Sequence, residues 1–177
     1  MVCGRFQHPR RPRRGRREKG GSQQALGRSH GGWGSKLHLL TDGAGLPLAV
    51  MLSAGQRHES LYLEPLVELA MAHGRRPEYL LGDKGYSAPR IRRWLSQHGI
   101  QPVIPHRADE HRVHPNLPLL DKTRYRQRNV VERAVGWIKQ FRSVATRFDK
   151  LARCYLAMLR LAFIRIALRR ADSSDTA

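Results

Sequence analysis

The sequence predicts an α/β protein in which helices pack against a small mixed sheet. Two observations favour this fold class. Short apolar runs that suit strands alternate along the chain with segments whose apolar residues recur at helical spacing. The length of 177 residues is also sufficient for one domain with a sizeable core.

The first predicted elements are a hairpin and a helix. Residues 36–41 (KLHLLT) and 46–52 (LPLAVML) are expected to be strands, joined by a turn at residues 42–45 (DGAG). Residues 59–73 are expected to be a helix, because their apolar residues share one face and Pro65 lies near the first turns, where proline is tolerated. That face consists of Leu63, Leu66, Val67 and Ala70.

The second half continues the alternation of strands and helices. A strand at residues 79–81 precedes a helix at residues 88–97, whose start is marked by Ser87 and Pro89. A short strand at 102–104 and a polar loop from 105 to about 122 follow. A helix around Glu132 and a long helix that closes the core complete the predicted order: strand, strand, helix, strand, helix, strand, helix, helix.

The charge of the chain points to a polyanionic partner, and its composition divides it into three parts. The formal net charge is +19, and the excess of Lys and Arg extends over the whole length, which favours nucleic acid. Residues 1–35 are predicted to be a basic arm rich in Arg, Gly and Ser and without regular structure. Residues 36–170 are the predicted domain, and residues 171–177 a tail.

The cysteines and the C-terminal segment indicate the cellular compartment in which the protein is expected. Cys3 and Cys154 lack metal-ligand spacing, and no apolar signal-peptide core follows the N-terminal charges, so a reducing cytoplasm is expected. Arg153, Arg160 and Arg165 interrupt the apolar C-terminal run, which disfavours a membrane-spanning helix. A helix lying on a membrane surface is the alternative.

The most informative motif is a stripe on the predicted Glu132 helix. Tyr125, Arg128, Glu132 and Lys139 fall at i, i+3, i+7 and i+14, within an arc of roughly 60° on an α-helix. A carboxylate between two cations and a phenol suits a metal ion that faces a phosphate. The apolar residues of the same segment lie on the adjoining arc: Val131, Ala134, Val135, Ile138 and Phe141.

A second carboxylate is expected near this stripe. Asp83 follows the apolar run at 79–81 and the break at Gly82, which places it at the carboxyl edge of a sheet, where ligands bind in open α/β folds. The alternative for Asp83 is a helix-start or turn aspartate. The alternative for the stripe is an ordinary basic helix face with an ion pair between Arg128 and Glu132.

Both motifs resemble one family. The spacing Y-x2-R-x3-E-x6-K is similar to the glutamate region of the DDE-type transposases of bacterial insertion sequences, and G-D-K-G-Y at residues 82–86 to their second-aspartate region. The resemblance runs from roughly Lys19 to Leu168. It implies an RNase H-like fold with two Mg²⁺ or Mn²⁺ ions held by an Asp–Asp–Glu trio, of which Asp83 and Glu132 are two members.

The resemblance also implies the reaction and the partners. The expected chemistry is nicking at the ends of an element, followed by attack of the freed 3′-hydroxyl on target DNA. Tyr125, Arg128, Lys139 and Lys84 are expected to contact the double-stranded DNA of the element ends and the target. The resemblance further implies a homo-oligomer on DNA, no membrane partner and a nucleoid-associated location in the bacterial cytoplasm.

The first aspartate of the trio is absent. Before Thr41 the only acidic residue is Glu18, which lies in an Arg-rich run, so the first strand of the RNase H-like order is expected to be missing. The hypothesis is that the reading frame starts inside, or is shifted against, a longer transposase gene, and it predicts that upstream DNA in another frame encodes a strand ending in Asp. The isolated chain is then expected to be inactive.

Three alternatives remain. A DNA-binding remnant without activity would inhibit transposition by occupying element ends or by entering mixed oligomers. A metal-dependent nuclease of the same fold would cut DNA and join no ends. A basic structural protein that binds RNA would be insensitive to the change Glu132→Ala.

Overall fold

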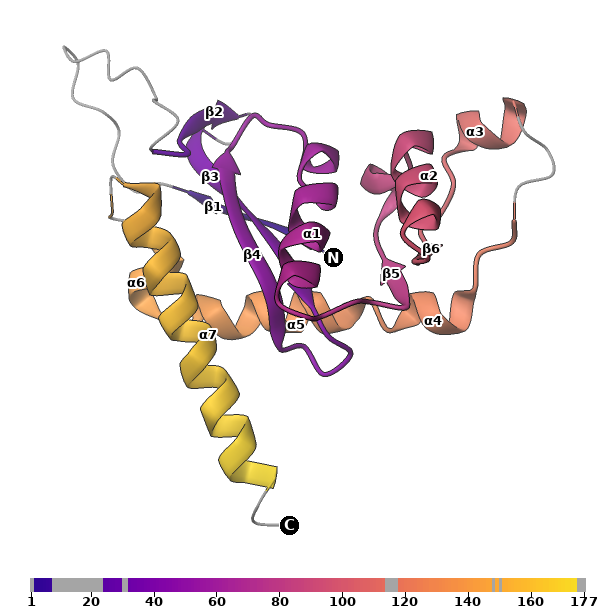
Figure 1. Ribbon diagram of the computed structural model, residues 1–177. Coiled ribbons are helices and arrows are strands. Elements are labelled where there is room, and N and C mark those ends of the chain that lie inside the picture. Colours follow the sequence, from indigo (N-terminus) through magenta and orange to yellow (C-terminus); the bar gives the residue numbers. More distant parts are fainter. Residues whose placement is uncertain are drawn as a thin grey trace.

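The computed structural model describes residues 2–7, 24–29, 32–113, 118–147, 149 and 151–174. The strands are β1 (Val2–Gln7), β2 (Gly27–Ser29), β3 (Gly32–Thr41), β4 (Pro47–Ala54), β5 (Tyr79–Leu81) and β6 (Gln101–Val103). The α-helices are α1 (Leu63–Ala72), α2 (Pro89–Gln97), α3 (Ala108–Val113), α4 (Lys122–Arg126), α5 (Asn129–Lys139), α6 (Arg142–Ala145) and α7 (Ala152–Ser174). Two 3₁₀ helices are η1 (Glu59–Leu61) and η2 (Lys84–Tyr86). The predicted α/β class is confirmed (Figure 1).

The larger sheet is antiparallel and centred on β3, which pairs with β1, β2 and β4. The expectation of a missing first strand is wrong, because β1 pairs with β3 from Val2 opposite Leu39 to Gln7 opposite Gly34. Within the arm expected at residues 1–35, β1, β2 and the start of β3 are strands rather than irregular chain. The prediction for residues 8–23, 30 and 31 lies outside the described residues. Backbone pairing needs no particular side chain, so an Arg-rich neighbourhood does not prevent a six-residue strand from forming.

The β3–β4 hairpin forms as predicted. Asp42 closes its turn, because its Oδ1 accepts hydrogen bonds from the backbone N–H groups of Ala44 (2.9 Å) and Leu46 (2.8 Å). Gly45 follows with φ of 90°, a conformation that disfavours other residues. The hairpin brings the apolar residues of two adjacent strands onto both faces of the sheet.

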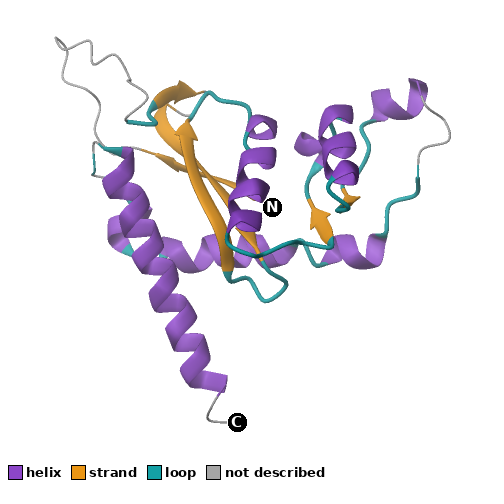
Figure 2. Cartoon of the chain, in the orientation of Figure 1, coloured by secondary structure: helices purple, strands orange, loops and turns teal. Residues whose placement is uncertain are grey.

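The smaller sheet is separate. Strand β5 pairs in parallel with β6, from Tyr79 opposite Gln101 to Leu81 opposite Val103, and α2 connects the two strands (Figure 2). The single mixed sheet expected from the sequence is therefore divided into an antiparallel sheet and a parallel pair. The predicted apolar face of α1 is confirmed: Leu63, Leu66, Val67 and Ala70 are buried.

Two apolar clusters cover opposite faces of the β3–β4 hairpin. Leu40 and Ala49 face a cluster that includes α1, α2, β5 and the residues on either side of β6. Leu37, Leu39 and Val50 face a second cluster with α5 and α7. This alternation of inward residues follows from the two-residue period of a strand, and it explains why β3 is buried at most of its positions.

Three boundaries differ from the sequence prediction. The polar loop from residue 105 contains α3, the helix around Glu132 is divided into α4 and α5, and α7 extends through residue 174 into the expected tail. The division falls at Gln127 and Arg128, where the N–H groups of Arg128 and Val130 bond three residues back, as in a 3₁₀ turn. The apolar face of α5 is nevertheless buried as predicted, except that Phe141 follows the helix and is half-buried.

A buried arginine between α6 and α7 connects this part of the chain to β3 and to the residues before β2. Arg147 lies between α6 and α7 and is fully buried. Its guanidinium donates to the carbonyl of Gln24 and the hydroxyl of Ser35, and lies 5.1 Å from the centre of the Tyr155 ring. Burial lowers the pKa of Arg147 from its usual value. The contacts secure the residues before β2 against the closing helix.

Candidate functional site

Asp83 lies where β5 ends. Its backbone is extended, with φ of −80° and ψ of 178°, and its Oδ1 accepts a hydrogen bond of 2.9 Å from the N–H of Gly85 at the start of η2. The predicted position after a strand is confirmed, although only Leu80 of β5 is buried. The contact with Gly85 is that of a helix-start aspartate, the alternative that the sequence left open. The bond within the turn uses one carboxylate oxygen, and no ion pair of Asp83 is found with any other described residue.

A carboxylate that the sequence did not single out lies beside Asp83. A Cβ atom placed on Gly85 would be 2.9 Å from Oδ1 of Asp83 and 3.4 Å from Oε1 of Glu59. The two carboxylate oxygens are therefore no farther apart than the sum of these distances. Glu59 begins η1, 24 residues earlier in the chain, and there an acidic residue also suits a helix start.

Lys36 holds Glu59 in its ionised form. The Lys36 Nζ lies 2.7 Å from Oε2 of Glu59 and donates a second bond of 2.7 Å to the carbonyl of Arg57. Burial tends to raise the pKa of Glu59, but the hydrogen bond and the charge of Lys36 outweigh it, so the pKa is lower than usual. Glu59 is thus a fixed anion next to the Asp83 turn.

Within the stripe predicted around Glu132, Arg128 contacts both Tyr125 and Glu132. The Nη2 atom of Arg128 lies 3.3 Å from Oε1 of Glu132, and the guanidinium lies 5.4 Å from the centre of the Tyr125 ring. Glu132 remains half in solvent, with 52% of its side chain exposed. Lys139 is exposed at the end of α5, on the same predicted face.

The structure does not unite these groups into one complete metal site. Asp83 bonds within its own turn and Glu132 pairs with Arg128. Within the described part of the chain, no group of three or more His, Cys, Asp or Glu residues could hold a metal ion. Strand β1 supplies no carboxylate ligand, because its sequence VCGRFQ has no acidic residue. The residues present therefore do not fit two divalent ions by themselves.

A polar network fixes the turn after Asp83 from the other side. Glu110 of α3 accepts hydrogen bonds from the buried Ser87 hydroxyl (2.8 Å) and from Nδ1 of His106 (2.9 Å). Burial tends to raise the pKa of Glu110, but the bonds from His106 and Ser87 outweigh it and lower the pKa. Arg107 donates to the carbonyl of Lys84, whose side chain is exposed beside Asp83. The network belongs to a segment that the sequence predicted to be loop.

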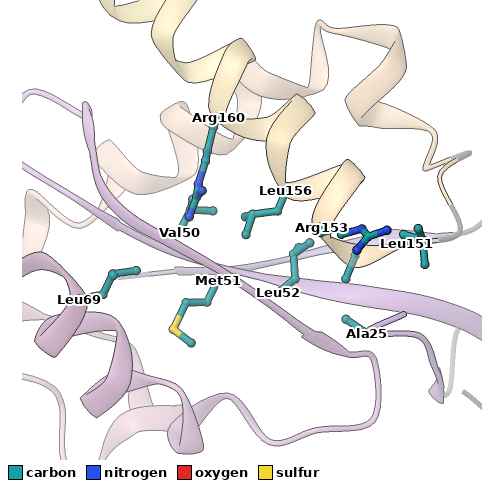
Figure 3. Close-up of a pocket in the computed structure, with 10 residues that line it drawn as sticks. Ala25, Val50, Met51, Leu52, Leu69, Leu151, Arg153, Leu156 and Arg160 are labelled. Atoms are coloured by element: carbon teal, nitrogen blue, oxygen red, sulfur yellow. The ribbon is translucent and has the colours of Figure 1, made fainter. Parts of the chain in front are cut away.

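Two cavities of the described part of the chain lie elsewhere. They have volumes of about 530 Å³ and 750 Å³ and follow β4 between α1 and α7. Figure 3 shows Leu156 and Arg160 of α7 on one side of β4 and Leu69 of α1 on the other. A groove of this kind is lined mostly by apolar side chains, so it does not mark the carboxylate site. No described helix is both long and apolar enough to cross a membrane.

Comparison with known proteins agrees with the motifs. Residues 7–166 match the family described as Transposase DDE domain. A protein of Burkholderia cepacia, named "Putative transposase for insertion sequence element IS402", is 36% identical over 151 residues, which cover 80% of this chain and 67% of the relative. No solved structure matches the chain. Since the family match extends over most of the sequence, and the relative is aligned over most of it too, the chain belongs to the family of transposases with a DDE domain.

Proposed function

We propose that this chain is the DNA-binding, catalytic-domain portion of an insertion-sequence transposase and that its metal site lacks one carboxylate. The observation that carries the proposal is the position of Arg128, which lies between α4 and α5 and contacts both Tyr125 of α4 and the exposed Glu132 of α5. A guanidinium held in this way is oriented for a phosphate. The proposed fold is RNase H-like, with β1 in the place of the strand that carries the first aspartate.

The proposed roles follow from exposure and charge. In a completed site Asp83 and Glu132 would hold divalent ions, Mg²⁺ or Mn²⁺, which would supply positive charge for the attacking and leaving oxygens. Arg128, Lys139 and Lys84 would bind the backbone of double-stranded DNA, both at the element ends and in the target. The partly exposed Glu132 carboxylate supports this role, because a ligand must remain accessible to an ion that also contacts substrate.

A DNA-binding inhibitor of transposition is the second candidate. It is favoured by β1, which has no acidic residue and pairs with β3 where the aspartate-bearing strand is expected. For the isolated chain we therefore expect DNA binding without cleavage. The family function and the inhibitory function differ only in whether the missing carboxylate is supplied by an upstream reading frame. The proposed location is the nucleoid of the bacterial cytoplasm.

The first experiment measures cleavage and strand transfer on DNA that carries the flanking element ends, with Mg²⁺ or Mn²⁺. The chain is compared with a version in which residues 2–7 are replaced by a strand that ends in Asp, as the reading-frame hypothesis predicts. We expect activity only in this completed protein, and its loss on Asp83→Asn or Glu132→Gln. Asp109→Asn is the matched control, because Asp109 is an exposed acidic residue of α3.

Each result has a distinct meaning. Cleavage without strand transfer by the completed protein would indicate a nuclease of the same fold. Activity that survives both Asp83→Asn and Glu132→Gln would refute the proposed ligands. Glu59→Gln tests whether the neighbouring carboxylate acts as the third ligand, since it would then abolish activity as completely as Asp83→Asn.

A second experiment separates the stripe from general positive charge. Arg128→Ala should reduce the slope of log K against log salt concentration for DNA binding by about one. Arg133→Ala is the control, because Arg133 is an exposed arginine of α5 about 100° from the stripe. Equal effects of the two variants would show that the stripe has no special part in binding.

A further inference from the structure

Strand β4 forms an unprotected edge of the larger sheet. Within the described part of the chain it pairs only with β3, so the backbone groups on its other side have no strand to bond. Natural proteins protect such an edge by making the strand short or by placing charges, prolines or bulges in it. The sequence of β4, PLAVMLSA, has eight residues without a charge, and its proline is the first residue. The irregular pairing with β3 lies at that same end, between Leu40 and Thr41, so the rest of the edge is open to another strand.

The two cavities along β4 form one groove at this edge, here called the edge groove. They adjoin, because Val50 and Leu69 line both of them. Figure 3 shows β4 between α7 on one side and α1 on the other. Met51 lies on the side of Leu69 and α1, whereas Val50 lies on the side of Leu156 and α7. A strand added to β4 would therefore insert its side chains alternately against α1 and against α7.

The edge groove suits apolar side chains in its middle. Leu48, Met51 and Leu52 of β4 are only half-buried, as are Leu69 of α1 and Leu156 of α7. An added strand would complete their burial, which stabilises the pair in addition to the backbone hydrogen bonds. The eight residues of β4 extend over about 26 Å at 3.3 Å per residue, so the occupant is a segment of about the same length.

Arginines mark both ends of the edge groove. Arg75 lies at the end where β4 begins, Arg153 at the end toward Leu52, and Arg160 between them. All three are exposed, and no ion pair within the described part of the chain involves them. Asp42 lies near the first end, but its Oδ1 is bonded within its own turn. The charge therefore favours an occupant with acidic residues at both of its ends.

We infer that the edge groove binds an extended acidic segment of another protein, which adds a strand to β4. Its apolar residues lie in the middle of the groove, and its carboxylates face the arginines at the ends. A second copy of this chain fits less well, because its net charge is +19 and it would bring the same arginines to the groove. Double-stranded DNA would be attracted by the arginines, but it offers no strand to the backbone of β4. The inference goes beyond the proposed function, because it requires neither DNA cleavage nor a metal ion.

A designed peptide tests whether the backbone of β4 takes part in binding. The probe is a fluorescein-labelled peptide of sequence DEVTVIVTED, and fluorescence anisotropy measures its binding to the full chain. We expect saturable binding of one peptide per chain. The control is the same peptide with methyl groups on the backbone nitrogens of its six central residues. It keeps every charge and side chain but cannot donate hydrogen bonds to β4, so its affinity should be at least about tenfold lower.

Two pairs of substitutions test the arginines with equal change of net charge. Arg153→Gln with Arg160→Gln should lower the affinity for the peptide by about tenfold at low salt, the effect of losing two exposed ion pairs. Arg93→Gln with Arg133→Gln is the matched control, because both residues are exposed arginines of other helices. Its affinity should change by less than about twofold. Glutamine suits a helix, and circular dichroism of each variant verifies that the helices are retained.

Amide hydrogen exchange locates the peptide on the unmodified protein. Saturation with the peptide should slow exchange in β4 by about tenfold or more, because the added strand pairs with its outer backbone groups. Exchange in β5 and β6 should not change, because these strands form the other sheet.

Four results would overturn the inference. Equal affinity for the methylated and unmethylated peptides would show that charge alone attracts the probe. Unchanged exchange in β4 would locate the peptide elsewhere. Displacement of the peptide by a short DNA duplex, with the same loss of duplex affinity in Arg153→Gln with Arg160→Gln, would assign the arginines to DNA. A dimer of the chain that excess peptide dissociates would show that a second copy covers the edge.

Discussion

Lowering the pH from 7 to 5 should destabilise this protein through one histidine. His38 on β3 is fully buried, its Nε2 lies 2.8 Å from the Ser53 hydroxyl, and its ring stacks on Tyr62 with centroids 4.3 Å apart. Its Nδ1 atom is buried without a hydrogen-bond partner among the described residues. Burial, aided by the nearby charge of Lys36 and opposed by Glu59, lowers the pKa of His38 from 6.5 to about 4.

The sign and the size of the effect follow from this shift. Below pH 6.5 the unfolded chain binds a proton at His38 and the folded protein does not, so the free energy of unfolding falls as the pH falls. At 1.36 kcal/mol per pKa unit, the loss between pH 7 and pH 5 is about 2 kcal/mol. The loss approaches about 3 kcal/mol at pH 4, where the folded protein begins to bind the proton as well.

Urea unfolding at pH 7, 6 and 5 measures this loss directly. The variant His38→Gln has no titratable group at this position and should lose most of the pH dependence between 7 and 5. The lowered pKa values of Glu59 and Glu110 affect stability only below their ordinary range near 4.5, so they contribute little in this interval. If the protein and His38→Gln showed the same change from pH 7 to pH 5, the assigned protonation state of His38 would be wrong.

Two further substitutions test the contacts of Arg147 with the residues before β2 and the contacts of Glu110 with the Asp83 turn. Arg147→Ala should lower the free energy of unfolding by about 3 kcal/mol in urea titrations, because it leaves the carbonyl of Gln24 without its charged donor and opens a cavity. A loss of less than about 1 kcal/mol would contradict this expectation. Glu110→Gln removes a charged acceptor and should cost about 1 kcal/mol, whereas the neighbouring exposed Asp109→Asn should cost nothing measurable.

The sequence predicted the local elements because local patterns determine them. The apolar stripe of α1, the Asp-Gly turn of the hairpin and the position of Asp83 after β5 all follow from residues within one or two turns of each other. The contact of Arg128 with Tyr125 and Glu132 follows from helical spacing in the same way. These features needed no knowledge of the rest of the chain.

The features that the sequence did not predict depend on distant partners. Strand β1 becomes a strand only because the edge of β3 is available some 30 residues later. Glu59 reaches the Asp83 turn across 24 residues of sequence, and no spacing rule connects them. The α3 helix is held by the bonds from Ser87 and His106 to Glu110. The polar composition of the segment does not reveal these bonds, and it therefore predicted a solvated loop.

The two-sided core has a consequence for synthesis on the ribosome. Leu37, Leu39 and Val50 are made early, but the cluster that covers them contains Tyr155 and Phe163 from the last helix. The α1 side of the hairpin can be covered as soon as α1 has emerged, whereas the opposite side stays uncovered until nearly the whole chain has been translated. A nascent chain would therefore carry an apolar surface for most of its translation, which is the kind of surface that chaperones bind and that promotes aggregation.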